Sequence, residues 1–194
     1  MRGRPIAFDQ SRALDAAMHV FWARGYDAAS TRELQDAMRL SRSSLYQHFG
    51  NKEALFVRCL TRYRENLLDR LERHLREAPS AMMFLDELFL DTAESAASER
   101  AKLGCLIFNS ATELGYREDL PGQQARQSVA RITALFRQAV EQAQQAGDIN
   151  KHLDPATLAD FLTLGMAGLR TLIKSGADQK RAQAAAQHIL RGLG

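Results

Sequence analysis

The sequence predicts an all-α protein of about nine helices, and three observations support this fold class. Apolar residues recur at three- and four-residue steps through nearly the whole chain. No segment shows the alternation of apolar and polar residues that is typical of a half-buried strand. The prolines stand only where tails or helix boundaries are expected, at Pro5, Pro79, Pro121 and Pro155.

The composition is that of an ordinary folded protein of 194 residues, with 45% hydrophobic and 25% charged residues. No apolar run approaches the ~18 residues that a membrane span needs, and "MRGRPIAFDQ" has no apolar region for secretion. We therefore expect a cytoplasmic protein with no membrane partner. Cys59 and Cys105 stand alone, without the spacing of a zinc site, so we expect no metal and no cofactor.

The first two helices have clear start and stop signals. Asp9 can cap a helix that runs to about Arg24, where Gly25 ends it. In "STRE", Ser30 and Glu33 form a capping box, in which each side chain bonds the backbone N–H of the other. This box predicts a short second helix that ends near residue 38.

Two more helices follow closely. Ser41 can cap a third helix over about 42–48, held from behind by Leu45 and Phe49. Asn51 can cap a long fourth helix that ends near Glu77, before a proline. Further helices are expected at about 81–98, 103–115, 120–146, 156–175 and 179–191. We place a helix-turn-helix domain at 1–52 and a helical ligand-binding and dimerisation domain at 53–194.

The second and third helices form the pattern of a helix-turn-helix, two short helices joined by a turn and braced by an earlier helix. The third helix would leave a polar face outward, and a recognition helix presents such a face to the major groove of DNA. Gln47 is the best-placed base reader, because an amide can bond adenine through two hydrogen bonds, and Arg42 can read guanine. Tyr46 and Lys52 are expected to contact phosphates.

The charge distribution agrees with a DNA partner. The net charge is +3, and the first 52 residues carry all of this excess, with eight Lys/Arg and five Asp/Glu. A basic patch of this size is common on soluble proteins, so it is only supporting evidence for a polyanionic partner.

The order of these residues resembles a known family. "LYQHFGNKEALF", preceded by "STRELQDAMRLSRSS" and opened by "GRP", resembles the DNA-binding domain of TetR-family transcriptional regulators over about residues 9–56. The resemblance implies a homodimer on a palindromic double-stranded DNA operator, and usually repression that a small-molecule effector releases. The expected DNA contacts are Thr31, Arg32, Arg42, Ser43, Ser44, Tyr46, Gln47, His48 and Lys52.

One residue departs from the family pattern. The turn normally carries glycine where this chain has Arg39. We expect Arg39 to adopt a left-handed conformation at a cost of roughly 1–2 kcal/mol. Its side chain would then be an additional phosphate contact.

The segment 156–175 is apolar on too many sides for a surface helix, so it must be buried on more than one face. Burial inside the protomer is one explanation. The resemblance implies another, in which the last two helices of each protomer form a four-helix dimer interface. The expected dimer contacts are Leu158, Phe161, Leu162, Gly165, Leu169, Leu172 and Ile189.

The middle helices are expected to enclose the effector. Apolar candidates for the pocket wall are Met82, Met83, Phe84, Phe89, Phe108 and Phe136, all of which suit an ordinary core equally well. "GCL" at 104–106 resembles a helix start in a subset of the family, some of whose members sense electrophiles or oxidants through this cysteine. Expected ligand contacts are Cys105, Phe108, Asn109, Thr112 and Phe136. Asn109, Thr112 and Glu113 can equally brace neighbouring helices.

The sequence also bears on two other classes of function. An enzyme is disfavoured, because the chain has no phosphate-binding glycine loop, no metal-spaced histidines and no GxSxG nucleophile motif. The alternative that stays open is a helical adaptor that retains the helix-turn-helix fold without binding DNA.

Overall fold

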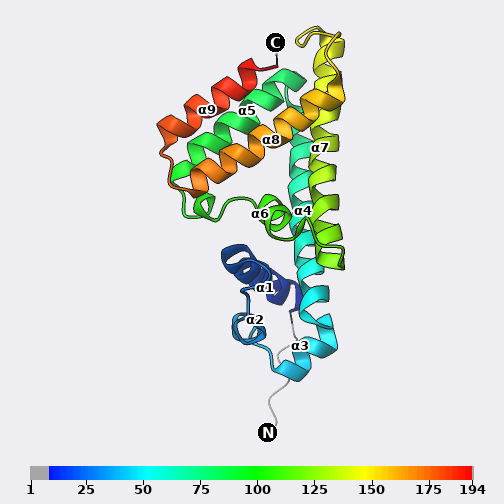
Figure 1. Cartoon of the computed structure of the whole chain (residues 1–194), viewed down its shortest axis with the longest axis vertical. Helices are drawn as coiled ribbons and strands as arrows, with labels where there is room; N and C mark the ends of the chain where they lie inside the picture. Colours follow the sequence, from blue (N-terminus) through cyan, green and yellow to red (C-terminus); the bar gives the residue numbers. More distant parts are fainter. Residues whose placement is uncertain (1–8, 194) are drawn as a thin grey trace.

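In a computed structural model, residues 9–193 form nine α-helices, and no strand occurs among them (Figure 1). The predicted all-α class is therefore confirmed. The motif "GRP", which is part of the family resemblance, lies outside the described residues. The helices are α1 (Gln10–Arg24), α2 (Thr31–Met38), α3 (Arg42–Phe49), α4 (Lys52–Glu77), α5 (Ala81–Glu94), α6 (Leu106–Leu114), α7 (Leu120–Ala146), α8 (Pro155–Lys174) and α9 (Gln179–Arg191).

The first four helices begin where short polar side chains cap them. The carboxylate of Asp9 accepts a hydrogen bond from the backbone N–H of Arg12 at 3.1 Å. The capping box closes as predicted: the Glu33 N–H donates to Ser30 Oγ at 3.1 Å, and the Ser30 N–H donates to Glu33 Oε2 at 3.0 Å. The Ser41 hydroxyl and the Asn51 amide oxygen cap α3 and α4 in the same manner. These caps supply acceptors for N–H groups that have no partner within the helix.

Two of the predicted middle helices differ at their ends. The segment expected over 81–98 is α-helical only to Glu94 and continues as a 3₁₀ turn, Ser95–Ala97. The segment expected over 103–115 begins at Leu106, after a second 3₁₀ turn, Ala101–Leu103. Gly104 separates this turn from α6, because its φ of 73° lies outside the range of a right-handed helix.

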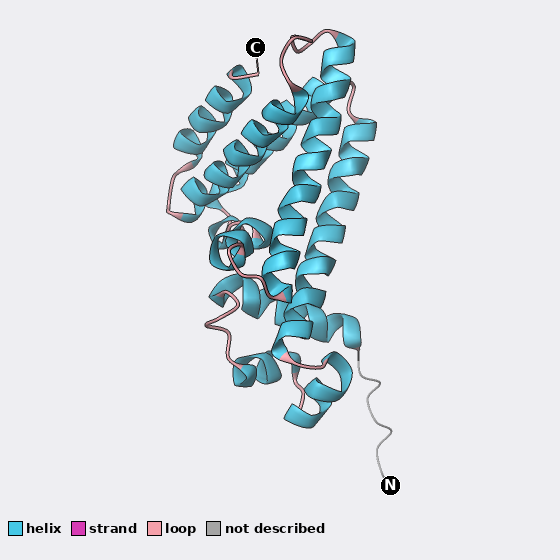
Figure 2. Ribbon diagram, turned by 45° about the vertical axis from the view of Figure 1, so that its right-hand side comes forward, coloured by secondary structure: helices cyan, strands magenta, loops and turns pink. Residues whose placement is uncertain are grey.

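The long helix α4 connects the two ends of the molecule (Figure 1). Its 26 residues span about 39 Å. Helices α1–α3 surround its N-terminal end, α5, α8 and α9 lie toward its C-terminal end, and α7 lies beside it (Figures 1 and 2). The first turns of α4 pack on α1: the ring of Phe56 meets Phe21 edge to face at 5.1 Å. The domain boundary between residues 52 and 53 stays a prediction, since α4 contributes core residues at both ends of the molecule.

Helix α8 is unusually apolar. The expectation that no apolar segment approaches the length of a membrane span was wrong for α8. Among residues 9–193 it is the one helix long and apolar enough to cross a membrane by length and composition alone, with 20 residues and a mean hydropathy of 1.3 in its most apolar window. The core helix of a soluble protein passes the same test, and α8 packs on α5, α7 and α9. Only 33% of that window is buried, however, so part of an apolar helix faces outward.

Candidate nucleic-acid interface and ligand cavity

Helix α3 has one buried and one exposed face. Leu45 and Phe49 are 1% and 3% exposed and hold the helix against the three-helix core. Arg42, Ser43, Tyr46, Gln47 and His48 are exposed, and Ser44 is half-buried. The α3 side chains predicted to contact DNA therefore lie on its outer face.

Hydroxyl groups organise the first turn of α3. Ser41 Oγ accepts from the Ser44 N–H at 3.1 Å and lies 2.9 Å from Ser43 Oγ and 3.0 Å from Ser44 Oγ. The N–H groups of a first helical turn have no partner within the helix, and the helix dipole favours anions there. This end of α3 is suited to a DNA phosphate.

Sequence reasoning missed one residue at the other end of α3. Arg58 on α4 donates from Nη1 to the backbone oxygen of His48 at 3.0 Å, and its guanidinium lies 4.8 Å from the ring centre of Phe49. Arg58 is exposed and thus places a positive charge at the C-terminal end of α3. No sequence motif indicates this role of Arg58, because the contact joins two different helices.

Lys52 contacts the α1–α2 loop within the chain, and its predicted phosphate contact stays a prediction. Its Nζ donates to the backbone oxygen of Asp27 at 3.2 Å and lies 4.8 Å from the ring centre of Tyr26. Lys52 therefore ties α4 to the α1–α2 loop. Thr31 and Arg32 lie in the first turn of α2, where Thr31 is half-buried and Arg32 is exposed.

The turn between α2 and α3 has the conformation expected for it. Arg39 lies in the left-handed region with φ of 55° and ψ of 43°. Its N–H donates to the oxygen of Asp36 at 3.3 Å, and the Leu40 N–H donates to the oxygen of Gln35 at 3.0 Å. These bonds satisfy carbonyl groups at the end of α2 and keep the turn closed without glycine.

A carboxylate on α6 links the C-terminal half to the helix-turn-helix. Glu113 accepts from the backbone N–H groups of Tyr26 at 2.9 Å and Asp27 at 2.8 Å. Arg117 adds an ion pair with Asp27 at 3.0 Å. Gly25 is required beside this contact, since its φ is 86° and a Cβ there would lie 2.8 Å from Glu113 Oε2. Of the two roles left open for Glu113, the structure gives it that of a brace.

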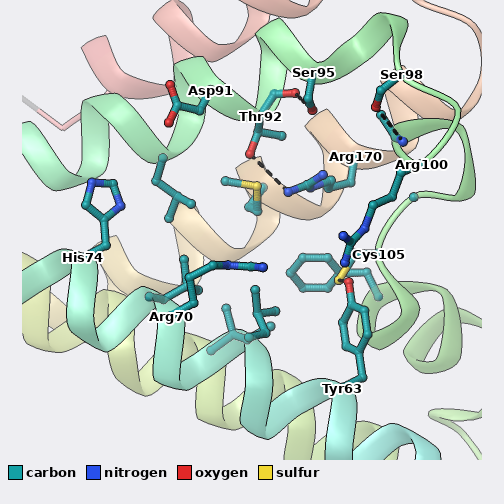
Figure 3. Close-up of a pocket in the computed structure, with 18 of the residues that line it drawn as sticks. Tyr63, Arg70, His74, Asp91, Thr92, Ser95, Ser98, Arg100, Cys105 and Arg170 are labelled. Carbon is teal, nitrogen blue, oxygen red and sulfur yellow. Dashed lines mark hydrogen bonds between the residues drawn. The ribbon is translucent and has the colours of Figure 1, made fainter. Parts of the chain in front are cut away.

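The C-terminal half contains a cavity of about 370 Å³ (Figure 3). Its wall comes from α4, α5, α7, α8 and the segment around the start of α6, and α1 contributes Trp22. Cys105, Phe108 and Phe136 line it, as expected of ligand contacts. Whether these side chains bind a ligand stays a prediction.

Other candidates for the pocket lie elsewhere. Asn109 donates from Nδ2 to the oxygen of Leu103 at 2.8 Å and so braces the turn before α6. Thr112 donates to the oxygen of Phe108 at 3.0 Å and borders a shallow groove between α6, α7 and α8. Met82, Met83, Phe84 and Phe89 are not part of the cavity wall.

The two cysteines differ in surroundings. Cys105 precedes α6, is 5% exposed and lines the cavity, where the Tyr63 hydroxyl donates to its Sγ at 3.7 Å (Figure 3). Burial raises the pKa of the Tyr63 hydroxyl far above its usual value, so it remains a donor. Cys59 is fully buried and donates to the oxygen of Leu14 at 3.6 Å; burial raises the pKa of its thiol strongly. Cys59 is a packing residue.

The predicted dimer contacts divide into two groups. Leu158, Leu162 and Leu169 are buried by the protomer's own helices and face its core; that they also contact a second protomer stays a prediction. Gly165 allows α8 to approach α9, since a Cβ there would lie 2.7 Å from Ile189 Cγ2. These residues take part in packing within the protomer, which the sequence pattern does not distinguish from packing between protomers.

The outward face of α8 has a different set of residues. Phe161 is partly exposed, Leu172 is half-buried, and Leu164, not singled out from the sequence, is 72% exposed. A Cβ at Gly168 would meet open space. We refer to Phe161, Leu164, Gly168 and Leu172 as the α8 outer face.

Models of two protein families match the chain. The model of "Bacterial regulatory proteins, tetR family" matches residues 13–59, and that of "Tetracyclin repressor-like, C-terminal domain" matches residues 81–189, which is more than half of the chain. The chain belongs to the TetR family. Proteins with similar sequences carry the names of HTH-type transcriptional regulators.

Two TetR-family relatives cover almost the whole chain. The HTH-type transcriptional repressor ComR of Escherichia coli K12 is 32% identical over 98% of this chain and 91% of its own length. A cysteine mutant of the TetR-family regulator CifR, solved in complex with 26bp double-strand operator DNA, is 31% identical. It superposes with a TM-score of 0.88 over 99% of this chain and 100% of that one.

Proposed function

We propose that this protein is a homodimeric transcriptional repressor that inserts α3 into the major groove of an operator half-site. The observation that carries the proposal is the orientation of α3: Leu45 and Phe49 are buried, while Ser43 and Gln47 face outward. In this orientation Gln47 reads base edges, and Tyr46 and the hydroxyl-rich first turn contact phosphates. The operator complex of the CifR mutant supports the same use of the fold.

The proposed dimer forms through α8 and α9. The α8 outer face is apolar and exposed, and covering it with a second copy removes this surface from water. Two-fold pairing places two α3 helices on one palindromic operator and doubles the number of phosphate and base contacts.

A small molecule in the cavity is the proposed releasing signal. The cavity touches α1 through Trp22, and α6 joins the α1–α2 loop through Glu113. A ligand that binds more tightly when α6 or Trp22 is shifted would stabilise the shifted state. Operator affinity would then fall by a factor set by the difference between the ligand's affinities for the two states.

Base reading is tested by comparing two substitutions on α3. Gln47→Ala removes a base contact and is expected to change the sequence preference at one operator position, at about 1–3 kcal/mol. Tyr46→Phe removes a phosphate contact and is expected to weaken all sequences alike. The measurement is binding to the promoter region of the protein's own gene and to single-base variants, at several salt concentrations.

The outcomes separate the candidate functions. If Gln47→Ala weakens binding to all the DNA variants equally, Gln47 contacts the DNA backbone. Another side chain must then read the bases. If the wild-type protein shows no salt-dependent binding to this DNA, the repressor proposal is wrong and the helical adaptor is favoured.

A thiol-reactive signal is the second candidate for release, because Cys105 lines the cavity. An electrophile such as N-ethylmaleimide would form a carbon–sulfur bond at Sγ, with the thiol proton passing to the maleimide carbon beside it. Release from DNA is then expected in wild type and in Cys59→Ala, and is abolished in Cys105→Ser. Equal release from the Cys105→Ser protein would rule out this signal.

A further inference from the structure

Three arginines from three parts of the chain line the cavity: Arg70 on α4, Arg170 on α8, and Arg100 just before the turn Ala101–Leu103. In Figure 3 the side chains of Arg70 and Arg170 reach into the cavity from different helices. Because guanidinium groups stay charged in proteins, the cavity wall carries three fixed positive charges.

These arginines have no acidic partner within residues 9–193. Arg170 donates from Nη2 to Thr92 Oγ1 at 3.3 Å, and Arg100 lies 5.5 Å from the ring centre of Trp22. Asp91 is the one carboxylate on the cavity wall, and it forms no ion pair with another described residue. The wall therefore has an excess of positive charge, which favours an anion.

A further polar group on the wall lacks a partner. Trp22 is 9% exposed, and its indole Nε1 is buried without a hydrogen bond to any described residue. This nitrogen has almost no accessible surface, so a ligand in the cavity would contact the Trp22 ring and not its N–H. The Tyr63 hydroxyl lies on the same wall, and its proton is donated to Cys105 Sγ.

Most of the remaining wall is apolar, formed by Leu67, Leu71, Leu88, Phe108, Ile132, Phe136 and Met166. Such a surface suits hydrocarbon or aromatic groups, with polar side chains fixing the orientation of the ligand. The volume of about 370 Å³ is at the small end of the range for small-molecule sites.

We propose that this cavity binds an amphipathic organic anion, with its acidic group held by Arg70, Arg100 and Arg170 and its apolar body against Phe108, Phe136 and Met166. The inference rests on the proposed effector role of the cavity and specifies the chemical class of the ligand. Because the site includes Trp22 of α1, the bound anion touches the helix that braces the helix-turn-helix.

The test compares two probes with the same apolar body. Anilinonaphthalene sulfonate carries an anionic group, and N-phenylnaphthylamine is its neutral counterpart. Trp22 is the single tryptophan of the chain, so quenching of its fluorescence by energy transfer reports binding of either probe, and the substitutions below locate the site. The wild-type protein is expected to bind the anionic probe at least ~10-fold more tightly than the neutral one, as for one charge-assisted contact.

Substitutions then test whether the arginines cause the preference for the anionic probe. Arg70→Gln and Arg170→Gln are each expected to weaken the anionic probe by ~10-fold and to leave the neutral probe within ~2-fold. Arg70→Lys retains the charge and most of the preference. Arg73→Gln is the matched control, because Arg73 is exposed on the same helix and is not part of the cavity wall. Unchanged binding of the neutral probe shows that the variant is folded.

Two results would overturn the proposal in different ways. Equal binding of the two probes, unaffected by the arginine substitutions, would reject an anionic ligand while keeping the cavity as a ligand site. If neither probe quenches Trp22, the effector role of the cavity also fails. Operator binding measured on the same samples tests the DNA-binding function separately.

Discussion

Arg39 holds the turn between α2 and α3 in a conformation that side chains other than glycine seldom adopt. Its φ of 55° places the Cβ close to the following carbonyl oxygen, which is unfavourable. Hydrogen bonds from the N–H groups of Arg39 and Leu40 to the end of α2 keep the turn in place. The exposed Arg39 side chain sits directly before the recognition helix, where a positive charge is useful to a DNA-binding surface.

Replacing Arg39 with glycine is expected to separate these two effects. Arg39→Gly should raise the free energy of unfolding by up to about 1 kcal/mol, since glycine has no Cβ to clash. It should also weaken operator binding for all sequences and reduce its salt dependence. Denaturant unfolding and DNA titrations measure the two quantities.

A control with the opposite sign lies one turn earlier. Asp36 is exposed within α2, and Asp36→Gly is expected to lower the free energy of unfolding by up to about 1 kcal/mol, because glycine is unfavourable inside a helix. If Arg39→Gly also destabilises the protein, the turn carries no strain that glycine relieves.

Single residues were predictable where their partners are close in sequence. The Ser30–Glu33 capping box joins residues three positions apart, so the letters alone identify it. Glu113 and Tyr26 are 87 positions apart, and nothing in either segment indicates the other. The same difference explains why Arg58, which contacts α3 from α4, was missed.

At the scale of elements, α6 has a central position. The segment at its start contributes Cys105 to the cavity, and near its C-terminal end Glu113 binds the α1–α2 loop. The sequence predicted this helix but placed its start three residues early, because the 3₁₀ turn and the positive φ of Gly104 leave no periodic signal. The helix therefore joins the proposed effector site to the DNA-binding domain.

Removing the Glu113 carboxylate is expected to weaken this connection. In Glu113→Ala, the backbone N–H groups of Tyr26 and Asp27 lose their acceptors, so movement of α6 is transmitted less to the loop. The ratio of operator affinities without and with anilinonaphthalene sulfonate should fall several-fold toward one. Fluorescence anisotropy of labelled operator DNA measures it.

The matched control is Glu118→Ala, which removes an exposed carboxylate from the loop after α6. It is expected to keep the wild-type ratio. If Glu113→Ala also keeps the wild-type ratio of operator affinities, the cavity is coupled to the DNA-binding domain through other residues, such as Trp22.

At the scale of the whole molecule, sequence periodicity could not show which apolar residues of α8 pack inside the protomer and which lie on its outer surface. It predicted a helix buried on more than one face, and this helix is present. The protomer's own core covers Leu158, Leu162 and Leu169, whereas Leu164 is left 72% exposed. Which side is covered depends on how α5, α7 and α9 are arranged around α8, and no local pattern encodes that arrangement.

Leu164→Glu is expected to separate the protomers, since it places a charge at the centre of the α8 outer face. Sedimentation velocity should show a shift from dimer to monomer, and operator affinity should fall by more than ~100-fold as one of two half-site contacts is lost. Leu153→Glu, at an exposed leucine in the α7–α8 loop, should stay dimeric. A dimeric Leu164→Glu protein would place the interface elsewhere.

The continuity of α4 determines how a chimaeric regulator could be built from this chain. Phe56 and Cys59 belong to the long helix yet pack on Phe21 and Leu14 of α1. A graft of a foreign operator specificity that was spliced at residue 52 would cut through this packing and pair mismatched surfaces. The splice belongs farther along α4, beyond Leu60, so that the transplanted segment carries its own supporting core.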